Sequence, residues 1–274
     1  MTNPIDLAMK AGQEFDKNLL IYKSSNEDLT SIFDKYDVKN KDVFTVLASS
    51  DQALSCYYKG AKTIDTFDRS YITLYYYYLR KWLILYKNEL YPSYKFLSFT
   101  GDGDIELYNL IKLIIPEDDK EKEAKTFWLK FMEFNNYKAN FLFEDRYCDE
   151  PKPYATEIDK IKGFYNKPID FKHIDITEKI AIDRKYDVIF LSNILEYKES
   201  FNNLNNIRYN LENLLKMNGI AICTYKLRKR KDLEHKEEIA NLTEGLLKLD
   251  SEHTHYEPLA GKKIDLAYAY RKYK

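Results

Sequence analysis

Ten residues of the sequence, 46–55, read VLASSDQALS and carry side chains suited to binding a polar ligand. A short apolar run ends at Ala48, and a stretch typical of a helix starts at Asp51. The free N–H groups and the dipole at the start of a helix favour an anion, and the hydroxyls of Ser49 and Ser50 can add hydrogen bonds to it. The carboxylate of Asp51 suits an ammonium group. These ten residues therefore predict a site for a charged small ligand.

A second acidic position follows the next apolar run, where residues 62–67 are followed by Asp68 and Arg69. In dinucleotide-binding folds, an acid at the end of the second strand accepts hydrogen bonds from the two ribose hydroxyls. Asp68 occupies that position, so we expect it to bind a ribose. Capping of the helix that follows is the alternative role for this carboxylate.

An alternation of strands and helices is expected to position these residues. Residues 43–48 and 186–192 are nearly continuous apolar runs, as strands buried on both faces of a parallel sheet require. The other expected strands are 62–67, 171–176, 219–225, 249–258 and 262–272. This pattern predicts an α/β fold with a doubly wound, mostly parallel sheet of seven strands. Ligands of such sheets bind beyond the carboxyl ends of the strands, where the strand order reverses.

Four helical stretches connect the expected strands, and the most polar of them covers residues 226–248. Residues 51–60 fit a helix that Gly60 ends. Between Tyr71 and Leu83, apolar residues recur at the spacing of one helical face. Residues 200–219 predict a helix that ends at Gly219.

The chain divides into a core domain with two helical additions. Residues 1–42 are expected to be helical, with Ser25 as a helix cap. Residues 43–274 form the α/β domain, and residues 92–166 form a helical insertion within it, because one crossover helix needs far fewer residues.

Composition excludes several classes of protein. The chain has 43 basic and 44 acidic side chains in 274 residues, so no overall charge attracts it to nucleic acid or to an anionic membrane. Cys56, Cys148 and Cys223 are odd in number and widely spaced, which fits neither disulfides nor a CxxC metal pair. No apolar run reaches the length of a transmembrane segment. We expect a cytoplasmic protein without a metal site.

Five segments follow one another in an order that is known from one enzyme family. They are VFTVLASSDQAL, KTIDTFDRS, FKHIDI, YDVIFLSNILEY and LLKMNGIAICTY. In order and spacing they resemble the motifs of class I S-adenosylmethionine-dependent methyltransferases, from about residue 40 to the C-terminus without the insertion. The resemblance implies a Rossmann-like methyltransferase fold and S-adenosylmethionine as the cofactor.

The first loop resembles one branch related to that family. In the 3-amino-3-carboxypropyl transferase of betaine-lipid synthesis, the loop reads like Ser-Gly-Asp-Asn, and a long helix with a Lys-rich end follows the second strand. Ser49, Ser50, Asp51 and Gln52 are similar to that loop, with Ser50 in place of its glycine, and YKFLSFTG resembles the Phe-Gly segment that follows. A side chain at position 50 narrows the approach of a ligand. The loop is therefore either wider than usual or has lost its cofactor.

The resemblance implies a role for residues at two further strand ends. Asp175 would accept a hydrogen bond from the adenine amino group, with Ile176 against the ring. Ser192 and Asn193 would face the sulfonium and the acceptor. Turn formation is the alternative for Asp175 and Asn193. The expected cofactor-binding residues are Ala48, Ser49, Ser50, Asp51, Gln52, Asp68, Arg69, Asp175, Ile176, Ser192 and Asn193, and no catalytic residue is assigned.

These observations together predict an S-adenosylmethionine-dependent transferase, with a methyltransferase for a small or lipid-like acceptor as the first choice. Transfer of the 3-amino-3-carboxypropyl group is the close alternative, and a non-catalytic ligand-binding or scaffold protein is the third. SNILEY replaces the Asn/Asp-Pro-Pro-Tyr segment of enzymes that methylate amines of nucleic acids, which argues against base N-methylation and leaves RNA modification of another kind as a rival.

Aromatic side chains of the N-terminal segment and the insertion are expected either to form a lid over the acceptor or to pack the core of the insertion. They are Tyr22, Tyr94, Phe99, Trp128 and Tyr147.

Overall fold

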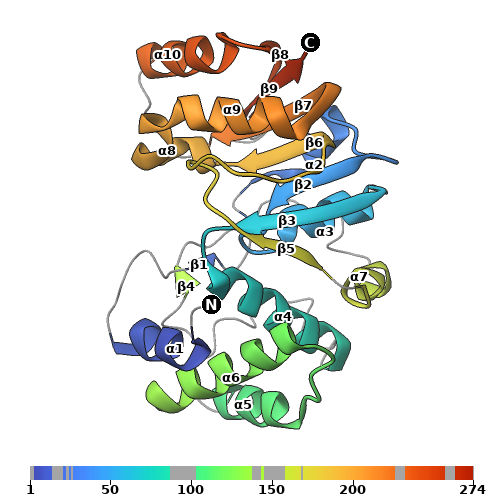
Figure 1. Cartoon of the computed structure of the whole chain (residues 1–274). Helices are drawn as coiled ribbons and strands as arrows, with labels where there is room; N and C mark the ends of the chain where they lie inside the picture. Colours follow the sequence, from blue (N-terminus) through green and yellow to red (C-terminus); the bar gives the residue numbers. More distant parts are fainter. Residues whose placement is uncertain are drawn as a thin grey trace.

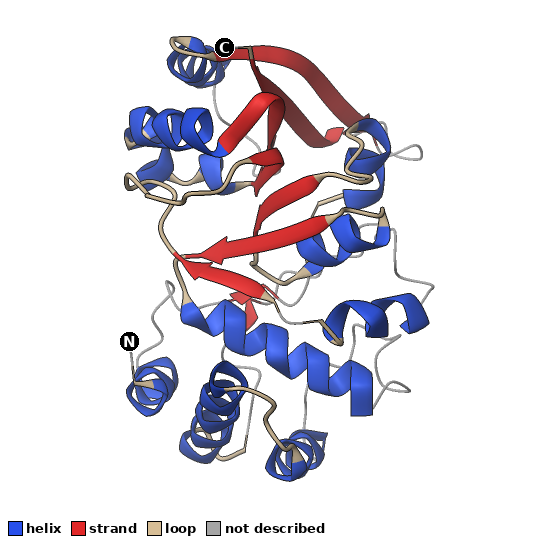
Figure 2. Ribbon diagram, turned by 45° about the vertical axis from the view of Figure 1, so that its right-hand side comes forward, coloured by secondary structure: helices blue, strands red, loops and turns tan. Residues whose placement is uncertain are grey.

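The centre of the molecule is a seven-stranded sheet with strand order β5-β3-β2-β6-β7-β9-β8 (Figures 1 and 2). The computed structural model describes residues 3–13, 21–22, 25, 27–86, 103–137, 143–144, 158–167, 169–225, 232–256 and 263–273. The strands of the sheet are β2 (Asp42–Val46), β3 (Thr63–Asp68), β5 (Asp170–His173), β6 (Tyr186–Ser192), β7 (Leu215–Tyr225), β8 (Leu247–Tyr256) and β9 (Lys263–Lys272).

Strands β5, β3, β2, β6 and β7 pair in parallel, and β9 is antiparallel to both of its neighbours, β7 and β8. From β2 the chain continues outward to β3 and β5, and it then returns to the other side of β2 to form β6. The strand order therefore reverses between β2 and β6, which is where ligands bind in doubly wound sheets. The predicted doubly wound, mostly parallel sheet is confirmed.

Helices cover both faces of the sheet (Figure 1). In β6, Val188 and Phe190 pack on one side, and Ile189 and Leu191 pack on the other, as the two-residue period of a strand requires. The helices on the first side are α2 (Leu29–Lys35) and α3 (Asp51–Tyr58). The helices on the second side are α8 (Lys198–Asn202), α9 (Leu204–Leu214) and α10 (Asp232–Thr243). None of the described helices is both long and apolar enough to cross a membrane.

A second group of helices packs around α4 (Tyr71–Tyr86). Its members are α1 (Pro4–Gln13), α5 (Gly103–Leu113), α6 (Asp119–Phe134) and α7 (Ile158–Tyr165). The sequence pattern predicts one buried face for α4, but every side chain from Ile72 to Ile84 is buried. The reason is that α4 lies between the sheet and these helices (Figure 2), so it has neighbours all round.

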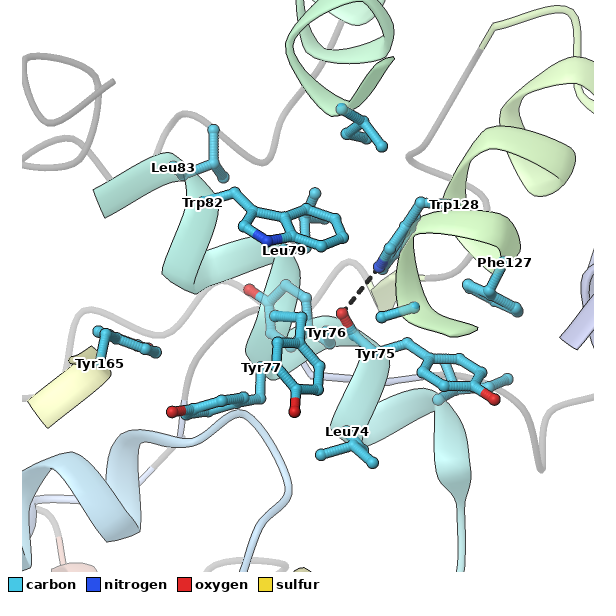
Figure 3. Close-up of a cluster of buried hydrophobic side chains, with 14 of the residues drawn as sticks. Leu74, Tyr75, Tyr76, Tyr77, Leu79, Trp82, Leu83, Phe127, Trp128 and Tyr165 are labelled. Carbon is cyan, nitrogen blue, oxygen red and sulfur yellow. Dashed lines mark hydrogen bonds between the residues drawn. The ribbon is translucent and has the colours of Figure 1, made fainter. Parts of the chain in front are cut away.

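The structure does not support the predicted lid role of Trp128. This side chain is fully buried, and its Nε1 donates a hydrogen bond to the carbonyl oxygen of Tyr75 at 2.8 Å (Figure 3). Trp128 thus packs the core of the helical group. The other expected lid side chains, of Tyr22, Tyr94, Phe99 and Tyr147, lie outside the described residues. The backbone of Tyr22 belongs to β1 (Ile21–Tyr22), which pairs in parallel with β4 (Phe143–Glu144).

Two expected element ends are wrong. Helix α2 is capped by Asp28, whose carboxylate accepts the N–H of Ser31 at 3.0 Å, and not by Ser25. Gly219 does not end a helix but lies within β7, where the pairing with β6 is irregular. A side chain at Gly219 would come within 3.0 Å of two carbonyl oxygens, so the glycine permits a close backbone approach.

Candidate functional site

The predicted ligand loop joins β2 to α3 at the carboxyl edge of the sheet, by which we mean the ends of β2, β3, β6 and β7. Ala48 has a φ of 41° and Ser50 has a φ of 73°, both in the left-handed region. Non-glycine residues pay about 1–2 kcal/mol for this conformation. The loop therefore adopts a backbone that usually requires glycine, although its sequence contains none.

A buried ion pair holds the loop in this conformation. Arg80, on α4, places Nη1 2.8 Å from Oδ1 of Asp51, and the same nitrogen donates to the carbonyl oxygen of Ser49. The side chains of Arg80 and Asp51 are 2% and 0% exposed. Oδ2 of Asp51 accepts from the backbone N–H of Ser25 and from Oγ of Ser49. Both oxygens of Asp51, predicted to bind an ammonium group, thus accept hydrogen bonds from the protein itself.

A second buried carboxylate, that of Glu27, lies at the strand-order reversal. Its Oε1 accepts from Oγ of Ser192 at 2.8 Å and from the hydroxyl of Thr224. Its Oε2 accepts from Nε2 of Gln52 at 2.9 Å and from Oγ of Ser25 at 2.8 Å. Glu27 is fully buried, and these donors join the ends of β6 and β7 to the start of α3. The N-terminal segment therefore reaches into the carboxyl edge.

Asp68, at the end of β3, faces the same loop. Its Oδ2 accepts the N–H of Ala48 at 3.1 Å, and its Oδ1 accepts the N–H of Ser70 at 3.0 Å. Burial raises the pKa of the Asp68 carboxyl above its ordinary value of 3.8, although these two N–H groups oppose the rise. Arg69 points elsewhere, because it forms an ion pair of 2.7 Å with Glu199 at the surface.

The other predicted site residues divide into two groups. Ser192 and Asn193 are buried at the end of β6, where Ser192 has a φ of 56°, and they share the carboxyl edge with the loop. Asp175 instead accepts hydrogen bonds from the N–H and hydroxyl of Thr177, at 2.9 and 2.7 Å, in a local turn. Ile176 is buried in the core beneath α9. The predicted strand also ends earlier than expected, at His173.

Two polar atoms of the loop region are buried without a hydrogen-bond partner among the described residues, namely Oγ of Ser50 and Oε1 of Gln52. Helix α3 also begins without a side-chain cap at Ser50. An unpaired buried polar group costs about 1–3 kcal/mol, which a ligand can recover by bonding to it. A hydroxyl and an amide oxygen beside a helix N-terminus fit the polar amino-acid end of S-adenosylmethionine, and Asp68 fits its ribose.

Four residues of this site have no counterpart among the predicted ones: Ser25, Glu27, Arg80 and Thr224. Arg80 leaves a signal in the sequence, since YYYYLRKWLILY places a basic pair inside an apolar helix. A buried cation needs an anion, so a partner for Arg80 could have been sought. Glu27 leaves no such signal, because its partner Thr224 lies 197 residues away in the sequence.

Comparisons with known proteins give structural likeness only. No model of a protein family matches this chain, and no curated protein matches it. The ribosomal protein L11 methylase of Lactobacillus delbrueckii subsp. bulgaricus is 12% identical, with a TM-score of 0.42 over 90% of this chain and 77% of the other. The N-methyltransferase NodS of Bradyrhizobium japonicum WM9, in complex with S-adenosyl-L-homocysteine, is 9% identical, with a TM-score of 0.45 over 100% of both chains.

A third structure, the magnesium protoporphyrin IX methyltransferase ChlM of Synechocystis PCC 6803 with bound SAM, is 9% identical, with a TM-score of 0.38 over 99% of this chain and 85% of the other. All three are methylases or methyltransferases. At such identities and scores, the fold of this chain is established by its own strand order and register, and its function has to be argued from its own residues.

Proposed function

We propose that this protein is an S-adenosylmethionine-dependent transferase, and that the carboxyl edge of the sheet is its cofactor site. The observation that carries the proposal is the position of Asp68. This carboxylate ends the strand next to β2, and it receives the N–H of Ala48 in a loop that opens a helix at the strand-order reversal. An acid in this position is suited to accept both hydroxyls of a ribose.

The unpaired amide oxygen of the loop region supports the same ligand. Oε1 of Gln52 can accept from the ammonium of the methionine group, and the start of α3, to which Gln52 belongs, favours the carboxylate of that group. Ser192 and Asn193 lie across the edge from the loop, where the sulfonium and the acceptor would meet. No such role follows for Asp175 and Ile176, which serve a turn and the core.

When bound, S-adenosylmethionine supplies a carbon that is already activated by the adjacent sulfonium. The protein then has to orient the acceptor, exclude water and let a proton leave the acceptor. In the methyl-transfer reaction that we favour, a bond would form between the acceptor atom and the methyl carbon, the sulfur–methyl bond would break, and S-adenosylhomocysteine would remain. Ser49, Asp51 and Glu27 are fully buried at the carboxyl edge, which favours exclusion of water there.

Transfer of the 3-amino-3-carboxypropyl group is the second candidate. The observation that favours it is the glycine-poor loop Ser49–Ser50–Asp51–Gln52 with a basic pair, Arg80 and Lys81, on the long helix after the second strand. The two reactions differ in the nucleoside that they release. Methyl transfer leaves S-adenosylhomocysteine, and aminocarboxypropyl transfer leaves methylthioadenosine.

Mass spectrometry of both nucleosides tests the proposal. The protein is incubated with S-adenosylmethionine and a cell extract, and the same reaction with Asp68→Asn is the control. We expect S-adenosylhomocysteine above the control. An excess of methylthioadenosine would favour the second candidate. If neither nucleoside exceeds the control, the protein is not a transferase of this kind, and a ligand-binding or scaffold role replaces the proposal.

A further inference from the structure

Three hydrogen-bond donors converge at the carboxyl edge and form what we call the cradle: Nε2 of Gln52, Oγ of Ser192 and Oγ1 of Thr224. They come from α3, from the end of β6 and from β7, so the fold itself brings them together. All three side chains are at most 5% exposed. Convergent buried donors from separate elements are suited to bind an anion.

The cradle is filled in this state by a carboxylate of the same chain. Glu27 accepts from Nε2 of Gln52 at 2.9 Å, from Oγ of Ser192 at 2.8 Å and from the hydroxyl of Thr224. With the hydrogen bond from Oγ of Ser25, the described residues give the carboxylate at least four hydrogen bonds, enough to occupy its lone-pair sites. The donors therefore suit a carboxylate in number and in placement.

The surroundings of the cradle match a ligand better than a purely structural contact. The amide of Gln52 turns Nε2 toward the carboxylate, and its Oε1 has no partner among the described residues. A carboxylate site beside an unpaired acceptor is complementary to an α-amino acid, which carries a carboxylate and an ammonium group on one carbon. Ser192 has a left-handed φ of 56°, and strain of this kind in a non-glycine residue is concentrated at binding sites.

We propose that the cradle is the binding site for the carboxylate of an α-amino-acid group, and that Glu27 is an internal competitor that occupies it until the ligand arrives. The inference rests on the proposed function, in which that group is the methionine end of the cofactor. Binding then requires the side chain of Glu27 to leave the cradle. Ser25 has to move with it, because its hydroxyl bonds Glu27, and this movement breaks the hydrogen bond from the N–H of Ser25 to Asp51. The affinity of the protein for its ligand is set in part by this exchange.

Removal of the competitor tests the inference. Glu27→Ala should bind S-adenosylhomocysteine at least fivefold more tightly than the unaltered protein, and Glu27→Gln should show a smaller gain, since a neutral amide competes less well for the donors. Thr224→Val in the Glu27→Ala background should cancel the gain. Glu121→Ala is the matched control, because Glu121 is another buried glutamate, bonded to Trp82 in the helical group, and its loss should bring no gain.

Amide hydrogen exchange on the unaltered protein gives a second test that does not depend on a variant. Saturation with S-adenosylhomocysteine should speed exchange in residues 27–35, because Glu27 leaves the cradle. Slower or unchanged exchange there, or a Glu27→Ala variant that binds no more tightly, overturns the inference while binding that depends on Asp68 leaves the proposed function intact.

The inference about the cradle and the proposed function can also be tested separately if S-adenosylhomocysteine does not bind. In that case free L-methionine is the probe. Binding to Glu27→Ala but not to the unaltered protein would support the cradle without the proposed function. Absence of binding of either probe to either protein would overturn both.

Discussion

The charged groups at the two edges of the sheet differ in how deeply they are buried. At the amino edge, where the parallel strands begin, Lys216 bonds Asp42 at 2.6 Å and Asp187 at 2.8 Å, and Arg184 bonds both oxygens of Asp65 at 2.9 and 2.7 Å. The side chains of both cations, Lys216 and Arg184, are more than a third exposed. These pairs join neighbouring strands, and water can solvate their cations, although the carboxylate of Asp65 is itself buried.

At the carboxyl edge, the charges are inside the protein. Arg80 and Asp51 are almost completely buried, and Glu27 is fully buried. Polar atoms of Ser50 and Gln52 lack partners among the described residues. A sheet that only needed to be stable could pair its groups here as it does at the other edge. The left-handed Ser50 and Ser192, next to these unpaired atoms, therefore support a binding role for the carboxyl edge.

The largest effect is expected for the two arginines. Arg80→Met leaves the carboxylate of Asp51 buried without its cation, which should lower the free energy of unfolding by about 3–5 kcal/mol. Arg184→Met removes a partly exposed cation and leaves the buried Asp65 with the hydroxyl of Tyr186, so it should cost less, about 1–3 kcal/mol. Urea unfolding of both variants measures the difference. Equal losses would mean that burial does not distinguish the two edges.

Two aspartates of β3 separate binding from stability. Asp68→Asn should weaken S-adenosylhomocysteine binding by about 1.5–3 kcal/mol, because a charge-assisted acceptor is lost. Asp65→Asn changes a carboxylate of the same strand that pairs with Arg184 and Tyr186, so it should lower stability and leave affinity unchanged. Equilibrium dialysis with labelled nucleoside gives both affinities. A loss at Asp65 as large as that at Asp68 would place the ligand elsewhere.

Ser50, the N-cap of α3, and Ser55, within α3, test the strain in the loop. Ser50→Gly relieves a left-handed residue and removes an unpaired hydroxyl, so it should raise stability by about 1–2 kcal/mol and preserve or improve binding. Ser55 also has a buried hydroxyl without a partner in the described part of the chain, but it lies in the helix, and Ser55→Gly should cost ~0.5 kcal/mol. Thermal unfolding should show opposite signs. A large loss of binding in Ser50→Gly would mean that the hydroxyl is a required contact.

The smallest effect expected is a pH dependence of binding. Ribose hydroxyls donate to the ionised form of Asp68, so affinity should fall as the pH is lowered, and the fall should start above 3.8 because burial raises the pKa of this group. The same raised pKa means that the folded state holds the proton more tightly than the unfolded chain. Its contribution to stability is thus present below pH 3.8 and is lost as the pH rises through the raised pKa. Titrations at several pH values check this, and Asp68→Asn should abolish the dependence.

Much of the fold could be predicted because its signals are local. The run 186–192 gives β6 residue for residue, and the helix stop at Gly60 follows α3, with a φ of 84° that only glycine adopts freely. The end of α9 could not be predicted in this way. Whether residues 215–219 continue the helix or begin β7 depends on an irregular pairing with Tyr186, which is a long-range contact.

The candidate site could be predicted only in part, for a related reason. The loop and Asp68 stand at strand ends, and strand ends can be read from the order of elements. The partners that fix their geometry come from elsewhere: Arg80 lies 29 residues beyond Asp51, and Glu27 lies 165 residues before Ser192. Side-chain pairing across such separations leaves no periodic pattern in a single sequence.

The central claim is that the carboxyl edge binds S-adenosylmethionine. Calorimetric titration of the unaltered protein with S-adenosylhomocysteine tests it most directly, because the measurement needs neither an acceptor nor a variant. We predict heat from a single site, with a dissociation constant in the micromolar range, together with a rise in the unfolding temperature. No heat and no change in the unfolding temperature, with S-adenosylmethionine as well as with its product, would contradict the claim.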